Sequence, residues 1–220
     1  SFDTKRVEDG LEIKVPFSFS CFGMRPISKG ELTYRISADG SLTISQRADI
    51  RNDLANYLPR YGYLWQLCGD CEHVEYYGLG PHESYCDRFH SEVYGRFAAD
   101  IKGLEANYLR PQENGSRFDT KWLKIGDKSM CLYIKSDRGF SFNASYYSPE
   151  QIYSAKHPFE LQKSENIYLH TDYFMAGVGS AACGPELDKR FALNGGETVD
   201  FTLTIKPCES DEDGFDLFYR

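Results

Sequence analysis

The chain has 220 residues, 15% of them aromatic, and a formal net charge of −8. This length suits a single domain with a substantial core. Because the chain is acidic and has no basic stripe, its charge excludes a nucleic-acid-binding surface. No apolar run is long enough to cross a bilayer, so we expect no membrane partner.

Alternation of apolar and polar residues runs through most of the chain and predicts β-strands. Asp39-Gly40 is a favoured turn dipeptide and predicts a hairpin between the second and third of these strands. The strands predicted in the first half are residues 11–19, 31–37, 41–48, 61–67 and 73–77.

In the second half, residues 130–135 and 140–147 are predicted to form a hairpin around Asp137-Arg138-Gly139. Two further strands are predicted over residues 166–174 and 197–206. The last of these should bury one face, which carries Val199, Phe201, Leu203 and Ile205.

Helix signals are few. Ser148 and Pro149 form an N-cap and a first helical residue, which predicts a short helix that ends near Ala155. The apolar spacing of residues 84–101 fits broken helical turns better than a strand. Many short antiparallel strands joined by glycine-rich turns indicate an all-β sandwich. It should occupy residues 1–207, with residues 208–220 as an acidic tail that is either loose or docks on a neighbouring domain.

Seven cysteines without regular spacing favour free thiols in a reducing compartment. The N-terminus also lacks an apolar signal core, so we expect a cytoplasmic protein or one whose leader has been removed. Cys68 and Cys71, with His73 nearby, have the spacing of half a zinc site. Because no second pair follows, loop or edge thiols are the favoured interpretation.

The densest group of functional residue types is residues 76–88, where a Gly78-Leu79-Gly80-Pro81 turn is followed by Glu83, Asp87 and Arg88. It lacks the lysine of a phosphate-binding loop. The two carboxylates could suggest catalysis, but hydrogen bonds from the arginine that lock the turn are the favoured interpretation.

This run, residues 111–117 and residues 170–185 occur together in an order and spacing that resemble the C-terminal domain of bacterial multidomain β-galactosidases of glycoside hydrolase family 2. The resemblance covers roughly residues 30–207. It implies a large antiparallel supersandwich, galactose mutarotase-like, that lacks its first strands. The motif positions are Gly78, Gly80, Pro81, Glu83, Asp87, Arg88, Glu113, Asn114, Gly115, Arg117, Asp172 and Gly177.

The resemblance implies a parent enzyme that hydrolyses terminal β-D-galactosides such as lactose. Its two catalytic glutamates would lie on a (β/α)₈ barrel, and this chain shows no βα alternation, so the chain alone is predicted to be inactive. It would buttress the barrel, in cis or as a separate subunit, within a homo-oligomer. The parent is expected to use Mg²⁺, with ligands outside this chain, and a monovalent cation, Na⁺ or K⁺.

The same resemblance implies two sites in this chain. Gly179, Ser180 and Cys183 would line the leaving-group side of the galactoside site. Many members carry a tryptophan where this chain has Cys183, and a thiol offers no aromatic face, so we expect weaker stacking on the leaving sugar. Backbone oxygens would hold the monovalent cation at Arg110, Pro111, Ile152 and Ala155.

Two alternatives remain open. A stand-alone carbohydrate-binding module would present exposed aromatic side chains, for which Trp65, Trp122 and the tyrosines are candidates. A mutarotase-like aldose epimerase would need an acid and a base beside a sugar ring. His82 and Glu83 are neighbours, so in a strand they point to opposite faces. His170 and Asp172 share a face, but a structural role is the favoured interpretation of this pair.

Overall fold

The computed structural model describes residues 2–179 and 186–219. They form an eleven-stranded, wholly antiparallel sheet with short helices. The strands are β1 (Asp3–Val7), β2 (Gly10–Phe19), β3 (Ser28–Ser37), β4 (Leu42–Ile50), β5 (Arg60–Cys68), β6 (His73–Gly80), β7 (Val93–Asp100), β8 (Arg117–Gly126), β9 (Met130–Ser145), β10 (Asn166–Met175) and β11 (Thr198–Glu209). The helices are α1 (Ile101–Leu104), α2 (Pro149–Ser154) and α3 (Gly214–Tyr219), with 3₁₀ turns at Pro158–Glu160 and Lys189–Phe191.

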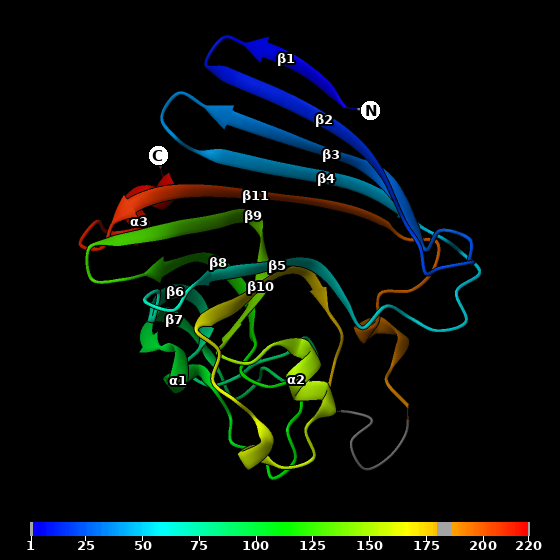
Figure 1. Ribbon diagram of the computed structural model, residues 1–220, viewed down its shortest axis with the longest axis vertical. Coiled ribbons are helices and arrows are strands. Elements are labelled where there is room, and N and C mark those ends of the chain that lie inside the picture. Colours follow the sequence, from blue (N-terminus) through cyan, green and yellow to red (C-terminus); the bar gives the residue numbers. More distant parts are fainter. Residues whose placement is uncertain (1, 180–185, 220) are drawn as a thin grey trace.

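The sheet folds over itself to enclose the core. Its strands run in the order β1-β2-β3-β4-β11-β9-β8-β6-β7, while β10 branches from β9 and carries β5. Figure 1 shows β1 to β4 and β11 as one broad curved layer, with β5 and β10 beyond β9. Tyr63 of β5 and Phe201 of β11 stack with ring centroids 6.0 Å apart, although their strands are not hydrogen-bonded neighbours. The rings therefore meet across the core, and the predicted all-β antiparallel fold is confirmed.

The core lies between these layers and draws on strands from both. Val199, Phe201 and Leu203 of β11 are buried on one face, as their alternation predicts. From the other side, Ile167 and Leu169 of β10 enter the same cluster. Apolar burial of this kind contributes about 25 cal/mol per Å² and is the main stabilising term.

The predicted hairpin over residues 130–147 is wrong, because β9 is one continuous strand of 16 residues. Ile134 pairs with Leu123 and Phe142 pairs with Arg117, so both halves of β9 lie along β8. Gly139 adopts a φ of +81°, which bends the strand instead of reversing it. The first half pairs also with β11 and the second with β10, so β9 connects the two layers.

The prediction of broken helical turns over residues 84–101 is wrong. Residues 93–100 of this segment form β7, which pairs with β6. The strand lies at one end of the sheet, where an edge strand needs no clean apolar face. The helix there, α1, begins only at Ile101. The strands β1 and β8 also lack a prediction from the sequence.

The short helix predicted after Ser148 is confirmed as α2. The Ser148 hydroxyl accepts a hydrogen bond from the Gln151 N–H at 3.2 Å, and Pro149 is the first helical residue. Ala155 is the C-cap. The helix therefore has the predicted bounds, and it places residues 152–155 beside β10.

The C-terminal segment packs on its own sheet. Phe215 of α3 meets the fully buried Trp122 of β8 edge-on, with centroids 5.4 Å apart, and Leu217 is buried in the same cluster. The Lys124 ammonium donates to the carbonyls of Ser210 and Glu212 at 2.8 and 2.6 Å. The domain boundary at residue 207 and the missing first strands stay predictions.

Candidate functional site

Two glycines at the end of β6, Gly78 and Gly80, allow close neighbours just before the chain turns. A Cβ on Gly80 would lie 2.3 Å from the Tyr76 hydroxyl, and one on Gly78 would lie 2.9 Å from Thr120 Cα. The peptide bond between Gly80 and Pro81 is cis. After this turn, residues 82–88 enter a polar network at this end of the sheet.

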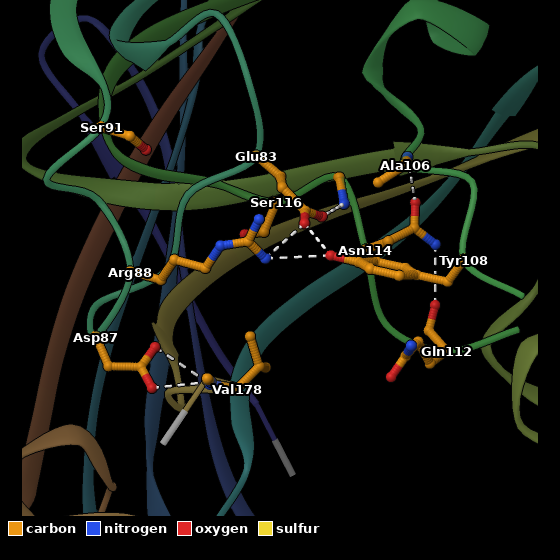
Figure 2. A network of polar contacts seen from close by, with 12 residues as sticks. Glu83, Asp87, Arg88, Ser91, Ala106, Tyr108, Gln112, Asn114, Ser116 and Val178 are labelled. Atoms are coloured by element: carbon orange, nitrogen blue, oxygen red, sulfur yellow. Dashed lines mark hydrogen bonds and ion pairs between the residues drawn. The ribbon is translucent and has the colours of Figure 1, made fainter. Parts of the chain in front are cut away.

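Glu83 is the centre of this network (Figure 2). One carboxylate oxygen accepts hydrogen bonds from Arg88 Nη1 at 2.8 Å and from the Tyr108 hydroxyl, and the other accepts from the Gly115 N–H at 2.9 Å. The Glu83 side chain is only 6% exposed. It therefore ties together three loops, and hydrogen bonds to a charged acceptor of this kind each contribute about 1.5–3 kcal/mol.

The loop that contains Asn114 is held by its own amide. Asn114 Oδ1 accepts from the Ala106 N–H at 3.0 Å and its Nδ2 donates to the Gln112 carbonyl at 2.9 Å. The buried Arg117 donates to the Gly115 carbonyl at 2.8 Å and to the Tyr76 hydroxyl at 3.1 Å. These contacts place the second motif against the first.

Asp87 connects the motif to the segment after β10. Its carboxylate accepts hydrogen bonds from the backbone N–H groups of Val178 at 3.2 Å and Gly179 at 3.0 Å (Figure 2). A Cβ on Gly177 would lie 2.4 Å from Asp87 Cγ, so only glycine fits there. Asp87 therefore fixes the start of the loop predicted to line the leaving-group side. Ser180 and Cys183 lie outside the described residues.

A buried ion cluster lies beside this network. Arg60 Nη2 donates to Glu113 Oε1 at 2.9 Å, and Arg60 Nε lies 3.0 Å from Asp172 Oδ2. Asp172 is 1% exposed, and in the described part of the chain its oxygens accept no hydrogen bond. Burial raises the pKa of Asp172 to about 7 and also raises the pKa of Glu113, against the lowering effect of Arg60. His170 Nδ1 lies 3.9 Å from Asp172 Oδ1, and burial and Arg60 lower the pKa of His170 to about 3.

A cavity of about 720 Å³ opens beside this cluster. Arg60, Glu113 and His170 line it, whereas Asp172 lies behind them. All four residues predicted to hold a monovalent cation also line this cavity: Arg110, Pro111, Ile152 and Ala155. The structure therefore brings this set together, and the cation itself stays a prediction.

Other candidates lie apart. The His82 side chain is 80% exposed while that of Glu83 is buried, so the two share no pocket. Trp122 is fully buried and Trp65 is half-buried, with its indole N–H donating to the Thr171 hydroxyl at 2.9 Å. Neither tryptophan is therefore an exposed platform, and only the tyrosines stay candidates for the carbohydrate-binding alternative.

Within the described ranges, 2–179 and 186–219, no group of three or more His, Cys, Asp or Glu side chains could hold a metal ion, and this holds also for Cys68, Cys71 and His73. Nor does any helix in these ranges have the length and apolar character needed to cross a membrane. The six cysteines described are free thiols.

Arg60, Tyr108 and Asn143 belong to these networks but have no signal in the sequence. The Asn143 amide donates to Glu113 Oε1 at 3.4 Å and to the Asn114 carbonyl. Arg60 stands at the start of β5, and its partners lie on a loop and on β10. The pairing of β5 with β10 brings Arg60 close to Asp172, and the loop before β8 brings Glu113 to Arg60. Asn143 is visible from the sequence only as a polar residue on a predicted strand.

A family model and individual relatives of this chain point to the same family. Residues 2–205 match the family described as β-galactosidase small chain. The chain is 32% identical to a β-galactosidase of Staphylococcus xylosus over 207 residues, which are 93% of this chain and 20% of that protein. It is 36% identical to one of Actinobacillus pleuropneumoniae over 186 residues, 84% of this chain and 18% of that protein. The chain thus spans about a fifth of the length of these relatives.

Among solved structures, the chain is similar to a galactose 1-epimerase from Lactobacillus acidophilus NCFM, with a TM-score of 0.46 and 11% identity, over 94% of this chain and 66% of that one. An aldose epimerase homologue from C. elegans gives a TM-score of 0.45 and 14% identity, over 94% and 68% of the two chains.

Proposed function

We propose, from the fact that this chain belongs to the β-galactosidase small-chain family, that it is the C-terminal part of an enzyme that hydrolyses terminal β-D-galactosides such as lactose. In that enzyme it buttresses the catalytic barrel and lines the leaving-group side of the active site. The barrel is supplied in cis or by a separate subunit, because the relatives are about five times as long as the region they share with this chain.

The anchoring of residues 177–179 by Asp87 supports the role at the leaving-group side. Two backbone N–H groups bound to one carboxylate hold the start of the loop in a fixed position. A substrate-facing loop needs such support, because a displacement of about 1 Å at an active site can cost a hundredfold in rate. The rigid sheet and the Glu83 network behind Asp87 provide it.

Catalysis belongs to the barrel in this proposal. A retaining glycosidase needs a nucleophile and an acid/base carboxylate about 5 Å apart, both open to the sugar. In this chain, Glu83 and Asp87 accept backbone and side-chain hydrogen bonds, and Asp172 is buried behind Arg60. Their contacts are those of structural residues, which supports the proposal that the chain alone is inactive.

The parent enzyme is further proposed to be a cytoplasmic homo-oligomer that uses Mg²⁺ and a monovalent cation. The free cysteines among the described residues support a reducing compartment. The four residues of the predicted monovalent site line one cavity, and backbone oxygens are ligands that suit a hard cation. The Mg²⁺ ligands are proposed to lie in the rest of the enzyme.

Substitution of Asp87 in the full-length enzyme tests the leaving-group role. Asp87→Ala removes both anchoring bonds, so we expect KM and the ratio of transfer to hydrolysis to change several-fold with lactose. Asp9→Asn, an exposed aspartate paired with Arg35, is the control and should leave both unchanged. Cys183→Trp should shift the same ratio towards transfer by adding an aromatic face. If both Asp87→Ala and Cys183→Trp leave the ratio unchanged, the assignment is wrong.

A further inference from the structure

The cavity of about 720 Å³ beside α2 has the size of a small-molecule site, since such sites span about 300–1,000 Å³. It is lined by the loop at residues 110–113, the end of β9, helix α2 and strand β10. Its location between rigid strands and a capped helix gives it a fixed shape.

One wall of the cavity is polar and offers both donors and acceptors. Glu113 and Asn143 line it beside His170. A neutral imidazole has one N–H donor and one acceptor nitrogen, and the lowered pKa of His170 keeps the ring neutral. Within the described residues the His170 ring forms no hydrogen bond, because its nearest partner, Asp172 Oδ1, is 3.9 Å away. The ring therefore has free capacity to bind a ligand.

Tyrosines line the cavity on its other sides. Tyr147 and Tyr168 are half-buried, and Tyr153 of α2 is 91% exposed at the rim. Tyrosine combines an apolar face with a hydroxyl, and this combination suits the apolar faces and hydroxyl edges of a sugar ring. An exposed tyrosine on the rim of a polar cavity is otherwise without a packing role.

The buried charge beside the cavity is compensated. Arg60 Nη2 lies 2.9 Å from Glu113 Oε1 and Arg60 Nε lies 3.0 Å from Asp172 Oδ2, so the guanidinium is paired with carboxyl groups. Arg110 and Lys156 also line the cavity, but both are exposed, so solvent and salt screen them. A wall whose buried guanidinium is already paired, beside a His170 ring with free hydrogen-bonding capacity, favours a neutral ligand rich in hydroxyls over an anion.

We propose that this cavity is a binding site for a neutral sugar of monosaccharide or disaccharide size, held by Glu113, Asn143 and His170 and stacked on Tyr153. The proposal goes beyond the proposed function, because it requires binding by this chain itself. It stands or falls independently of whether the parent hydrolyses galactosides.

Titration of the 220-residue chain with galactose, glucose and lactose, followed by backbone amide NMR, tests the proposal. We expect saturable shifts with a millimolar Kd, confined to residues 110–113, 143–156 and 168–170. The variant Tyr153→Ala, at an exposed position that tolerates truncation, should weaken binding about fivefold or more. Tyr57→Ala is the matched control, since Tyr57 lines another cavity of about 690 Å³, and it should bind as the wild type does.

Three results would overturn the proposal. One is the absence of saturable shifts up to about 200 mM sugar, far beyond millimolar affinity. The second is binding that Tyr153→Ala leaves unchanged or that shifts residues elsewhere. The third is a sugar phosphate that binds at least tenfold tighter than the neutral sugar, which would make this an anion site. Repeating the titration in NaCl and in KCl shows whether the predicted monovalent cation changes the affinity.

Discussion

Asp172 should make the stability of the fold depend on pH in a way that a single substitution reveals. Burial raises the pKa of its carboxyl from 3.8 to about 7. The folded state therefore holds a proton that the unfolded state releases, and stability falls as pH rises between these values. One pKa unit corresponds to about 1.4 kcal/mol, so the ionised carboxyl costs about 4 kcal/mol at its full extent. Asp172→Asn cannot ionise and should escape this cost.

His170 has the opposite effect over nearly the same range. Its pKa is lowered from 6.5 to about 3, so the unfolded state binds the extra proton and stability rises with pH across this window. In the wild type the two slopes largely cancel, with Glu113, whose pKa is also raised, adding to the slope of Asp172. We expect Asp172→Asn to grow more stable relative to the wild type by about 1.4 kcal/mol per pH unit between about pH 4 and 7. His170→Gln should lose stability relative to the wild type as pH rises from about 3 to 6.5.

Urea unfolding followed by tryptophan fluorescence at a series of pH values measures both differences. Subtracting the wild type at each pH removes the contributions of groups that the substitution does not touch. Asp9→Asn is the control, because the pKa of Asp9 is lowered and its difference should be flat above about pH 4.5. A difference for Asp172→Asn that stays constant from about pH 4.5 to 7 would refute the reasoning, since the buried carboxyl would then have an ordinary pKa.

Further predictions concern packing and thiols. Gly177→Ala should destabilise the chain by about 1–3 kcal/mol in urea titrations, because its Cβ would lie 2.4 Å from Asp87 Cγ. Gly179→Ala meets Asp87 only at 3.6 Å and serves as the matched control; equal effects at both positions would disprove the clash. Truncation after Asp213 removes Phe215 and Leu217 from Trp122, so we expect a loss of about 3–5 kcal/mol and a red-shifted tryptophan emission, whereas an unchanged thermal midpoint would contradict the packing. In timed alkylation read by mass spectrometry, the exposed Cys21 and Cys68 should react first. Cys208 should react last, since burial raises its pKa to about 11, and early labelling of Cys208 would speak against its burial.

Local signals in the sequence predicted those elements whose structure depends on near neighbours. The alternation of Val199, Phe201 and Leu203 identified β11, and the Ser148 cap identified α2. The segment around Gly139 misled for a physical reason: a glycine with positive φ can close a hairpin or bend a strand. Pairing of β9 with β8 on both sides of the bend decides between these outcomes, and that pairing is not local.

The candidate site was likewise predictable only where it depends on residues close in the sequence. The motif residues Glu83, Asp87 and Arg88 stand out in the sequence because polar residues directly after a glycine turn are concentrated there. Their partners do not stand out in the sequence. The Tyr108 hydroxyl and the Val178 N–H contact Glu83 and Asp87 only once the sheet has folded. The buried position of Asp172 likewise depends on Arg60, which pairs with it from a strand far away in the sequence. Burial of Lys124 could not be predicted either, because a lysine is rarely buried and the Ser210 carbonyl that accepts its hydrogen bond comes from a distant part of the chain.

We propose that this chain completes a β-galactosidase whose catalytic groups lie elsewhere. The most direct test measures nitrophenyl β-galactoside hydrolysis by the chain alone, by the remainder of the parent enzyme alone, and by the two together. We predict no turnover by the chain, little by the remainder, and restored hydrolysis when the two are combined. Turnover by the repurified chain, or full activity of the remainder without it, would contradict the account.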